Sequence, residues 1–417
     1  MIFKEQTKSI PITKEMVWES YKKVKSNKGS AGLDQQSLSD FDKVRSKELY
    51  KIWNRLASGS YIAPTIKRVN IPKGNGKTRP LGIPTVSDRI AQQVVKFYIE
   101  PRFERIFVAN SYGYRPNKSA HSAINEVLKN VLTHSWVIDL DIKEFFENVN
   151  HELLMKALGK HVSEKWALMY IKRWLEAPVQ LADGTIKTAD GKGTPQGGVI
   201  SPLLSNLYMH YCVDKWLEIH YPKAIMIRYA DDLVIHCKSH QESVELLANL
   251  SARLSVCCLT AHAEKTKIVY CKKDKRPLIG FPVQFDFLGF SFQPIRYKLK
   301  SGGSFLQYGC KMSRKSKVRI TKELRDLRFH NKSQRSIQDL ANLLNPKIRG
   351  WIHYYGKISQ RSLKPVFYYL HHRMIRWILN KYKRFKGSKV KAIAWLKQIG
   401  KSYPMLFYHW ELGYKMF

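Results

Sequence analysis

Two adjacent acids, Asp231 and Asp232, interrupt an otherwise apolar part of the chain. The segments Ile225 to Ala230 and Leu233 to Cys237 on either side predict two strands, with the acids at the turn between them. Burying a carboxylate in a core has a large desolvation cost, so a core position is excluded. The pair is therefore either a plain turn, which is the usual role of aspartate there, or part of a cation site.

A second acidic pair lies in the predicted strand from Trp136 to Ile142. Because side chains alternate along a strand, Asp139 and Asp141 share one face. A solvated edge strand would also carry two acids, but such a strand seldom leads directly into two aromatics, here Phe145 and Phe146. The spacing alone leaves Asp139 and Asp141 equivalent.

Carboxylates from two strands suit phosphoryl transfer onto a nucleotide chain. That reaction uses two divalent cations, one to activate the attacking 3′-hydroxyl and one to hold the triphosphate. Mg²⁺ prefers oxygen ligands and takes only one or two from protein, so a small cluster of aspartates is enough. The sequence predicts a site for two Mg²⁺ ions, with Mn²⁺ as an alternative.

The rest of the chain predicts the elements that position these acids, in an α+β arrangement. The expected elements are two helices around a glycine-bearing loop (27–32) before Ala57, a basic hairpin (66–71 and 79–84) around a turn at 73–77, a helix from Ser87 to about Phe107, helices up to Leu175, a Gly/Thr-rich loop (183–198), a helix from Pro202 to His220, a hairpin-like stretch (285–292) and Lys/Arg-rich helical segments beyond Lys298.

The composition of the chain indicates which kinds of partner it can bind. The 417 residues exceed one ordinary domain, and 72 Lys plus Arg against 33 Asp plus Glu leave a formal charge of +39. Such an excess indicates a polyanionic partner, for which phosphate backbones are the commonest choice, although a plain basic surface remains an alternative. No apolar run is long enough for a membrane span and no signal peptide is visible, which predicts a cytoplasmic protein without a membrane partner. The six cysteines lack metal-site spacing and are expected to be reduced, mostly buried thiols.

In order and spacing these segments resemble the motifs of group II intron-encoded reverse transcriptases and maturases. The matching segments are Asn27 to Asp34 (N-terminal extension motif), Ile71 to Pro84 (fingers hairpin), Ser111 to Pro116 (the following loop), Asp141 with Phe146 (first catalytic motif), Gly193 to Leu204 (second), Tyr229 to Asp232 (third), Glu264 to Lys267, and Phe287 to Phe290. The resemblance covers nearly the whole chain.

The resemblance implies roles for individual residues. The family places an aromatic five residues after its catalytic acid, which selects Asp141 over Asp139. The implied catalytic acids are Asp141, Asp231 and Asp232; the implied metal site comprises Asp141, Ile142, Asp231 and Asp232; and the implied nucleotide-binding residues are Lys73, Arg79, Phe146, Gln196, Gly197 and Lys265. The ring of Phe146 would lie beneath the incoming sugar and exclude a 2′-hydroxyl, and Lys265 would protonate the pyrophosphate leaving group.

The same resemblance implies contacts with primer and template. The residues concerned are Arg115, Pro195, Tyr229, Phe287, Leu288 and Gly289. Taken one by one, several have simpler explanations: the segment Phe287 to Phe290 could be ordinary core, and the cations of the hairpin could be solvated surface. The aromatics of the C-terminal third, at helical spacing, are individually more often core than stacking platforms.

The implied architecture is a right-hand polymerase, with fingers and a palm built on a small antiparallel sheet, followed by a helical thumb or maturase domain. The expected domains are an N-terminal extension with fingers (1–135), a palm with fingers insertions (136–298), a thumb/maturase domain (299–380) and a short basic nucleic-acid-binding extension (381–417).

The implied function is an RNA-directed DNA polymerase of bacterial type that copies intron RNA and assists splicing and retrohoming. Its implied partners are an RNA template (intron RNA), a DNA primer or target, and deoxynucleoside triphosphates; dimer formation is left open. The alternatives are an RNA-binding splicing maturase, a domesticated defence-associated reverse transcriptase, and an RNA-dependent RNA polymerase, which Phe146 disfavours. The chain shows no His-Asn-His endonuclease motif with cysteine pairs, so target cleavage is not expected from it.

Overall fold

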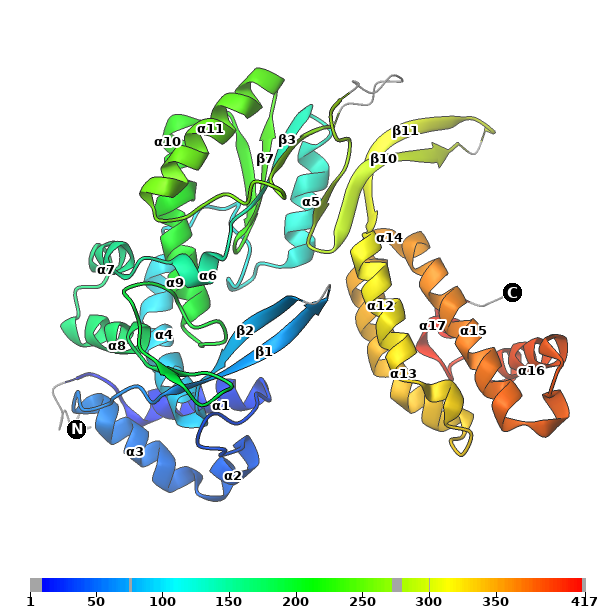
Figure 1. Ribbon diagram of the computed structural model, residues 1–417, viewed down its shortest axis with the longest axis horizontal. Helices are drawn as coiled ribbons and strands as arrows, with labels where there is room; N and C mark the ends of the chain where they lie inside the picture. Colours follow the sequence, from blue (N-terminus) through cyan, green and yellow to red (C-terminus); the bar gives the residue numbers. More distant parts are fainter. Residues whose placement is uncertain (1–9, 75–76, 272–279, 300, 415–417) are drawn as a thin grey trace, which may run out of the picture. The chain divides into compact units, whose positions relative to one another are not determined.

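The computed structural model describes residues 10–74, 77–271, 280–299 and 301–414, with the side chains of residues 73–77 outside the described part (Figure 1). The chain forms two compact units. The first comprises Met1–Ala123 and Ile138–Lys267, and the second comprises Ile124–Val137 and Ile268–Phe417. The predicted fingers and palm ranges thus fall largely in one unit, and the predicted ranges 299–380 and 381–417 fall together in the other.

The first unit begins with helices α1 (Lys14–Ser26), α2 (Leu38–Lys43) and α3 (Arg45–Ala57). The prediction of two helices in this segment was wrong, because the segment forms three. The chain leaves helical geometry at Val44, whose φ is −119°, and this separates α2 from α3. The predicted basic hairpin is confirmed as antiparallel strands β1 (Ile66–Gly74) and β2 (Lys77–Ile83). Short strands β4 (Val179–Gln180) and β5 (Ile186–Lys187) extend its sheet in the order β2-β1-β4-β5.

Helices support this hairpin and the acid-bearing strands. They are α4 (Val86–Glu104), α6 (Phe145–Asn148), α7 (His151–Gly159), α8 (Lys165–Leu175), α9 (Ser201–Met209), α10 (Lys215–His220) and α11 (His240–Val256). The predicted helix from Pro202 to His220 is confirmed, with a π-helical turn, η1 (His210–Asp214), between α9 and α10. Such a turn inserts a residue into the helix and changes which side chains face inward.

A second four-stranded sheet carries the acids. Its strands are β3 (Trp136–Asp141), β6 (Ile225–Tyr229), β7 (Asp232–Cys237) and β8 (Lys267–Tyr270), in the order β6-β7-β3-β8. The predicted hairpin is confirmed: β6 and β7 are antiparallel, and Tyr229 pairs with Asp232 across the turn. Helix α5 (Ala120–Asn130) and strands β3 and β8 contribute residues to both units.

The second unit contains a three-stranded sheet of β9 (Phe285–Phe287), β10 (Phe290–Lys298) and β11 (Ser304–Met312), followed by helices. The helices are α12 (Arg314–Asp326), α13 (Ile337–Trp351), η3 (Ile352–Gly356), α14 (Lys357–Ser359), α15 (Lys364–Lys381), α16 (Lys389–Ser402) and α17 (Tyr408–Glu411), with short 3₁₀ turns at Phe329–Asn331, Gln360–Leu363 and Lys383–Phe385. Trp351, Tyr355, Trp377 and Trp410 are buried, so these aromatics are core residues. The predicted boundary at residues 298 and 299 falls between the paired strands β10 and β11.

Two simpler predictions can be compared with the structure. All six cysteines are free thiols; five are buried and Cys258 is exposed, as expected. Within the described residues, no helix is both long enough and apolar enough to cross a bilayer.

Two buried histidines join the last helix of the second unit to α15. The Nε2 atoms of His371 and His409 lie 2.9 Å apart, and Trp410 Nε1 donates a hydrogen bond of 3.0 Å to His371 Nε2. Burial lowers the pKa of His371 to about 4, with a smaller effect of the His372 charge. Burial also holds the pKa of His409 well below its usual range. Both imidazoles are therefore neutral at pH 7.

Acid should loosen the docking of α17, because imidazoles in the unfolded chain titrate near 6.5. As the pH falls from 6.5 towards 4, the unfolded state takes up protons that the folded state cannot. His371 alone would lower stability by about 2 kcal/mol at pH 5, and neither histidine has an effect well above pH 6.5. The measurement is hydrogen-exchange protection of Tyr408–Glu411 at pH 7.5 and pH 5, corrected for intrinsic exchange.

The variant His409→Phe serves as the control, because it removes one titrating group and keeps a ring against Phe367, which stacks on His409 at 4.8 Å. It should lose less protection between the two pH values than the native chain. Equal protection of the native chain at both pH values would contradict the expectation.

Candidate active site

The turn between β6 and β7 presents Asp231 at the edge of its sheet. Ala230 has a φ of 58°, in the left-handed region that residues other than glycine rarely adopt. With Tyr229 paired to Asp232, Ala230 and Asp231 are the two residues of a tight turn. A left-handed residue is typical of such hairpin turns, since it matches the twist of the strands.

The acids of the two strands lie close enough to repel one another. The pKa of the Asp232 carboxyl is raised to about 7, chiefly because protein atoms surround its carboxylate, although the residue as a whole is solvent-accessible. The negative charges of Asp231, Asp141 and Asp139 raise this pKa further, and the positive charge of Arg79 opposes them. The structure therefore brings the predicted catalytic acids together.

Two lysines neutralise the acids of β3: Lys265 from the loop before β8, and Lys267 from the start of β8. Lys265 Nζ lies 2.7 Å from Asp141 Oδ2, and Lys267 Nζ lies 3.6 Å from Asp139 Oδ2. Backbone bonds fasten this loop to the end of β3: the His262 N–H donates to the Asp141 carbonyl at 2.7 Å. Lys265, predicted to act on the leaving group, thus lies directly beside a predicted metal ligand.

The donor set suits a divalent cation by its chemistry. Carboxylate oxygens are hard ligands, and a cation would offset the mutual repulsion that raises the pKa of Asp232. In the part of the chain that the structure describes, no three carboxylate, imidazole or thiol groups are arranged as a complete metal site. The Lys265 ammonium occupies one of the two carboxylate oxygens of Asp141, Oδ2. Ile142 has an apolar side chain, so it can offer a metal only its backbone carbonyl.

The loop Ser111 to Pro116 supports the turn from Tyr229 to Asp232, here called the acidic turn, through its backbone. The Tyr112 N–H donates to the Arg228 carbonyl at 2.8 Å, and the Arg228 N–H donates to the Asn110 carbonyl at 3.0 Å. A β-carbon on Gly113 would lie 2.4 Å from the Ala230 nitrogen, closer than real contacts allow. Only glycine therefore fits at position 113 without moving the turn.

Arg115 has a different place from the one predicted. Its guanidinium is almost fully buried, pairs with Glu104 at 3.0 Å, and donates to the carbonyls of Val108 and Ser111 at 2.7 and 2.8 Å. It also lies over the Phe107 ring. Because these contacts engage the side chain within the protein, Arg115 shapes the loop and has no free group for a template.

Gly113→Ala should slow primer extension at least about tenfold, because the added methyl group has to shift the turn that carries Asp231. The measurement is the single-turnover extension rate at saturating primer, template and nucleotide. Gly159→Ala is the matched control, since a β-carbon there meets nothing within 4 Å. A Gly113→Ala rate equal to that of the control would refute the expectation.

The predicted nucleotide-binding loop and hairpin are in direct contact. The Gly82 N–H of β2 donates to the Gln196 carbonyl at 2.6 Å, and a β-carbon on Gly197, whose φ is 113°, would lie 2.2 Å from the Gly82 carbonyl oxygen. Gly197 thus allows the close approach of two backbones, as glycine-rich loops commonly do. Arg79 is exposed on β2. The side chain of Lys73 lies outside the described residues.

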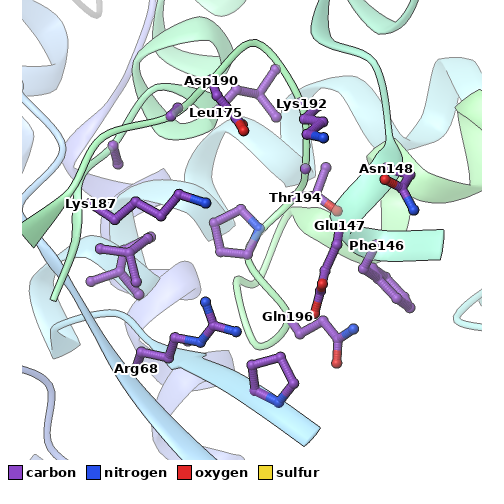
Figure 2. A pocket seen from close by; sticks show the side chains of 18 of the residues that line it. Arg68, Phe146, Glu147, Asn148, Leu175, Lys187, Asp190, Lys192, Thr194 and Gln196 are labelled. Carbon is purple, nitrogen blue, oxygen red and sulfur yellow. The ribbon is translucent and has the colours of Figure 1, made fainter. Parts of the chain in front are cut away.

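Next to this contact lies a cavity of about 340 Å³, lined by Gly82, Gln196 and other residues. Figure 2 shows Phe146, Gln196 and Thr194 on one side of it. Arg68 and Lys187 point into it from the other side. The buried Thr194 hydroxyl has no hydrogen-bond partner among the described residues. The lining carries as many acids as cations: Glu144, Glu147 and Asp190 against Arg68, Lys187 and Lys192. The described lining does not include the three predicted catalytic acids.

The residues predicted to contact primer and template lie in both units. Tyr229 and Pro195 belong to the first unit; the Tyr229 ring lies 6.3 Å from that of Tyr114, and Pro195 lines the cavity. Phe287 is buried in the second unit, and Leu288 (φ 48°) and Gly289 (φ 78°) form the turn between β9 and β10. The Tyr354 hydroxyl donates to the Leu288 carbonyl at 2.9 Å. This turn, and not the Phe287 ring, is the accessible part of the motif.

Sequence reasoning missed the polar residues that hold the acidic turn from behind. Arg228, Asp214 and Asn206 are buried, and the Arg228 guanidinium donates hydrogen bonds to both Asp214 and Asn206. A signal was available: Arg228 interrupts the apolar strand Ile225 to Tyr229, and a lone arginine inside an apolar strand needs a buried partner.

Comparison with known proteins gives two family matches. Residues 71–292 match the family described as "Reverse transcriptase (RNA-dependent DNA polymerase)". Residues 317–395 match the "Group II intron, maturase-specific domain". The first match covers more than half of the chain and contains every predicted catalytic acid.

Three similar proteins come from distant organisms. Protein YkfC of Escherichia coli K12 is 35% identical over 237 residues, which cover 48% of this chain and 61% of that protein. An uncharacterized 91 kDa protein in the cob intron of Schizosaccharomyces pombe is 25% identical over 430 residues, which cover 87% of this chain and 52% of that protein. The group II intron-encoded protein LtrA of Lactococcus lactis is 32% identical over 199 residues, which cover 47% of this chain and 32% of that protein. The aligned chain spans less than two thirds of the length of each relative. The chain belongs to the reverse transcriptase family and carries a group II intron maturase-specific domain.

Proposed function

We propose that this chain is an RNA-directed DNA polymerase that copies intron RNA into DNA. The observation that carries the proposal is the cluster of Asp141, Asp231 and Asp232 at one end of a small sheet, within the part of the chain that matches the family. Reverse transcriptases use divalent metal ions, and two Mg²⁺ ions held by these acids would activate the primer 3′-hydroxyl and neutralise the triphosphate.

The other predicted site residues would bind and orient the incoming nucleotide. Arg79 and Lys73, on the hairpin, would clamp the triphosphate, and the electrostatic effect of Arg79 on Asp232 supports its place beside the acids. Gln196 and Gly197 would contact the base or sugar. Phe146, which lines the cavity, would exclude a 2′-hydroxyl. Lys265 would leave Asp141 when a cation binds and become free to donate a proton to pyrophosphate.

In this proposal the first unit supplies fingers and palm of a right-hand polymerase. The second unit supplies the thumb, or maturase domain, and a basic extension beyond residue 380. Helix α12 supports a role in binding nucleic acid, because it is densely cationic: it carries Arg314, Lys315, Lys317, Arg319, Lys322 and Arg325. Phosphate backbones would neutralise this charge.

Primer extension tests the proposal. The full chain should extend a DNA primer on an RNA template with deoxynucleoside triphosphates and Mg²⁺, and should stop when the cation is chelated. Ribonucleoside triphosphates should give little product. A chain that binds the primer–template duplex but fails to extend the primer, whichever divalent cation is supplied, would overturn the proposal.

The match of residues 317–395 to the maturase-specific domain favours a second function, assistance of group II intron splicing. Splicing depends on binding RNA and not on the acids of the first unit. Asp231→Ala should therefore keep this activity, measured as spliced product of an intron RNA that flanks the gene. Loss of splicing together with extension would show that the two functions are not separable.

A further inference from the structure

Arg228 lies at the centre of a buried polar network behind the acidic turn. It is a residue of β6 with 0% of its surface exposed. Its guanidinium donates to both carboxylate oxygens of Asp214, from Nε at 2.8 Å and from Nη2 at 2.5 Å. Its Nη1 donates to Asn206 Oδ1 at 2.9 Å and to the Ala230 carbonyl at 3.0 Å. Nearly all the donors of the side chain are thus engaged.

The partners of Arg228 come from rigid elements of the first unit. Asn206 is in helix α9, and its Nδ2 donates to the Gly113 carbonyl at 2.7 Å. Asp214 is the last residue of the π-helical turn η1, whose extra residue changes the face on which Asp214 lies. The guanidinium therefore ties the loop at Gly113, helix α9 and the π-helical turn to one peptide of the acidic turn.

Arg228 is the cation that balances the buried Asp214. The other candidate, His210, has its Nδ1 3.8 Å from Asp214 Oδ2, but burial lowers the pKa of His210 to about 4, so its imidazole is neutral. A buried carboxylate needs a charged partner with good geometry. The paired guanidinium is held firmly, and its remaining donors are fixed in direction.

The bond to the Ala230 carbonyl is the one that bears on chemistry. Ala230 is the left-handed residue of the turn, and its carbonyl belongs to the peptide that leads into Asp231. Fixing this peptide sets the direction of the Asp231 side chain. We propose that Arg228 is a positioning residue that aims Asp231 for cation binding, with Asn206 and Asp214 as its supports; this rests on the function proposed above.

The test compares three variants of the full chain. Arg228→Lys keeps a positive charge beside Asp214, but a single ammonium cannot reach Asp214, Asn206 and Ala230 together. Asn206→Ala leaves the buried ion pair intact and removes one support. Arg102→Lys is the control for losing a two-bond arginine–carboxylate pair, because Arg102 donates to Glu164 at 2.5 and 2.6 Å from a part-exposed position on α4.

Three quantities separate positioning from folding: the extension rate kcat, the nucleotide KM, and the Mg²⁺ concentration that gives half the maximal rate. Arg228→Lys should lower kcat about a hundredfold and raise the half-saturating Mg²⁺ severalfold, with KM within about twofold of the native value. Asn206→Ala should change the same quantities less, and Arg102→Lys should change none. Unaltered kcat and Mg²⁺ dependence in a folded Arg228→Lys chain would overturn the proposal; if that variant does not fold, Asn206→Ala decides in the same way.

Hydrogen exchange of the turn peptides distinguishes failure of this inference from failure of the proposed function. Amides from Tyr229 to Leu233 should exchange faster in Arg228→Lys than in the native chain or in Arg102→Lys, whether or not the chain extends primers. Equal exchange would overturn the positioning role even in an active enzyme. A native chain without extension activity would refute the polymerase proposal and leave the exchange result as the test of Arg228.

Discussion

Asp231→Ala should lower the rate of DNA synthesis on an RNA template by at least about a thousandfold, the equivalent of some 4 kcal/mol of transition-state stabilisation. The reason is its place: Asp231 is at the tip of the β6–β7 turn, next to Asp232 and close to Asp141. Asp231 and Asp232 are the two carboxylates of this turn. The measurement is single-turnover extension at saturating primer and template, with duplex affinity measured in parallel and expected to be unchanged.

Asp139→Ala provides the control for this prediction. Asp139 lies on the same face of β3 as Asp141, and its negative charge also raises the pKa of Asp232. It differs from Asp141 in two ways: it pairs with Lys267 at 3.6 Å, and the residue five positions after it is not aromatic. It should retain most of the native rate. A loss at Asp139 as large as that at Asp231 would show that the assignment of the catalytic acid on β3 is wrong.

Phe146→Ala should reduce the preference for deoxynucleotides over ribonucleotides by about a hundredfold, since one steric contact in a nucleotide pocket is worth up to about 3 kcal/mol. The Phe146 ring is held against Phe145, with centroids 5.2 Å apart, and cannot easily turn aside. The measurement is the ratio of kcat/KM for a deoxynucleotide to that for the matching ribonucleotide.

Phe146→Tyr is the control, because it keeps a six-membered ring at the same position. It should keep the native preference, whereas the alanine variant should gain ribonucleotide incorporation with little loss of deoxynucleotide incorporation. Unchanged selectivity in Phe146→Ala would remove the residue from the nucleotide site.

The strands that carry the acids could be predicted from the sequence because local signals agree there. In β3 the alternation of acids with Ile138 and Leu140 fixes which face carries charge, and in the β6–β7 hairpin two apolar runs flank one polar turn. The basic hairpin of β1 and β2 was equally visible, because glycines mark its turn. Period and turn chemistry are local properties, so one sequence is enough to reveal them.

The support of the site could not be predicted in the same way, because it depends on contacts between distant segments. Arg115 has the sequence features of a nucleic-acid ligand, yet its guanidinium is engaged by Glu104 and two carbonyls. The guanidinium of Arg228 meets Asp214 only because a π-helical turn changes the face of the preceding helix.

The cation count of the assembled complex tests the central claim most directly. The claim is that Asp141, Asp231 and Asp232 hold the divalent ions used for synthesis. With a primer that lacks its 3′-hydroxyl, an RNA template and the next deoxynucleoside triphosphate, Mn²⁺ bound to the chain can be counted by electron paramagnetic resonance without any reaction. The native chain should bind two ions and Asp231→Ala fewer, with nucleic-acid affinity equal in both; the same count in both would contradict the claim.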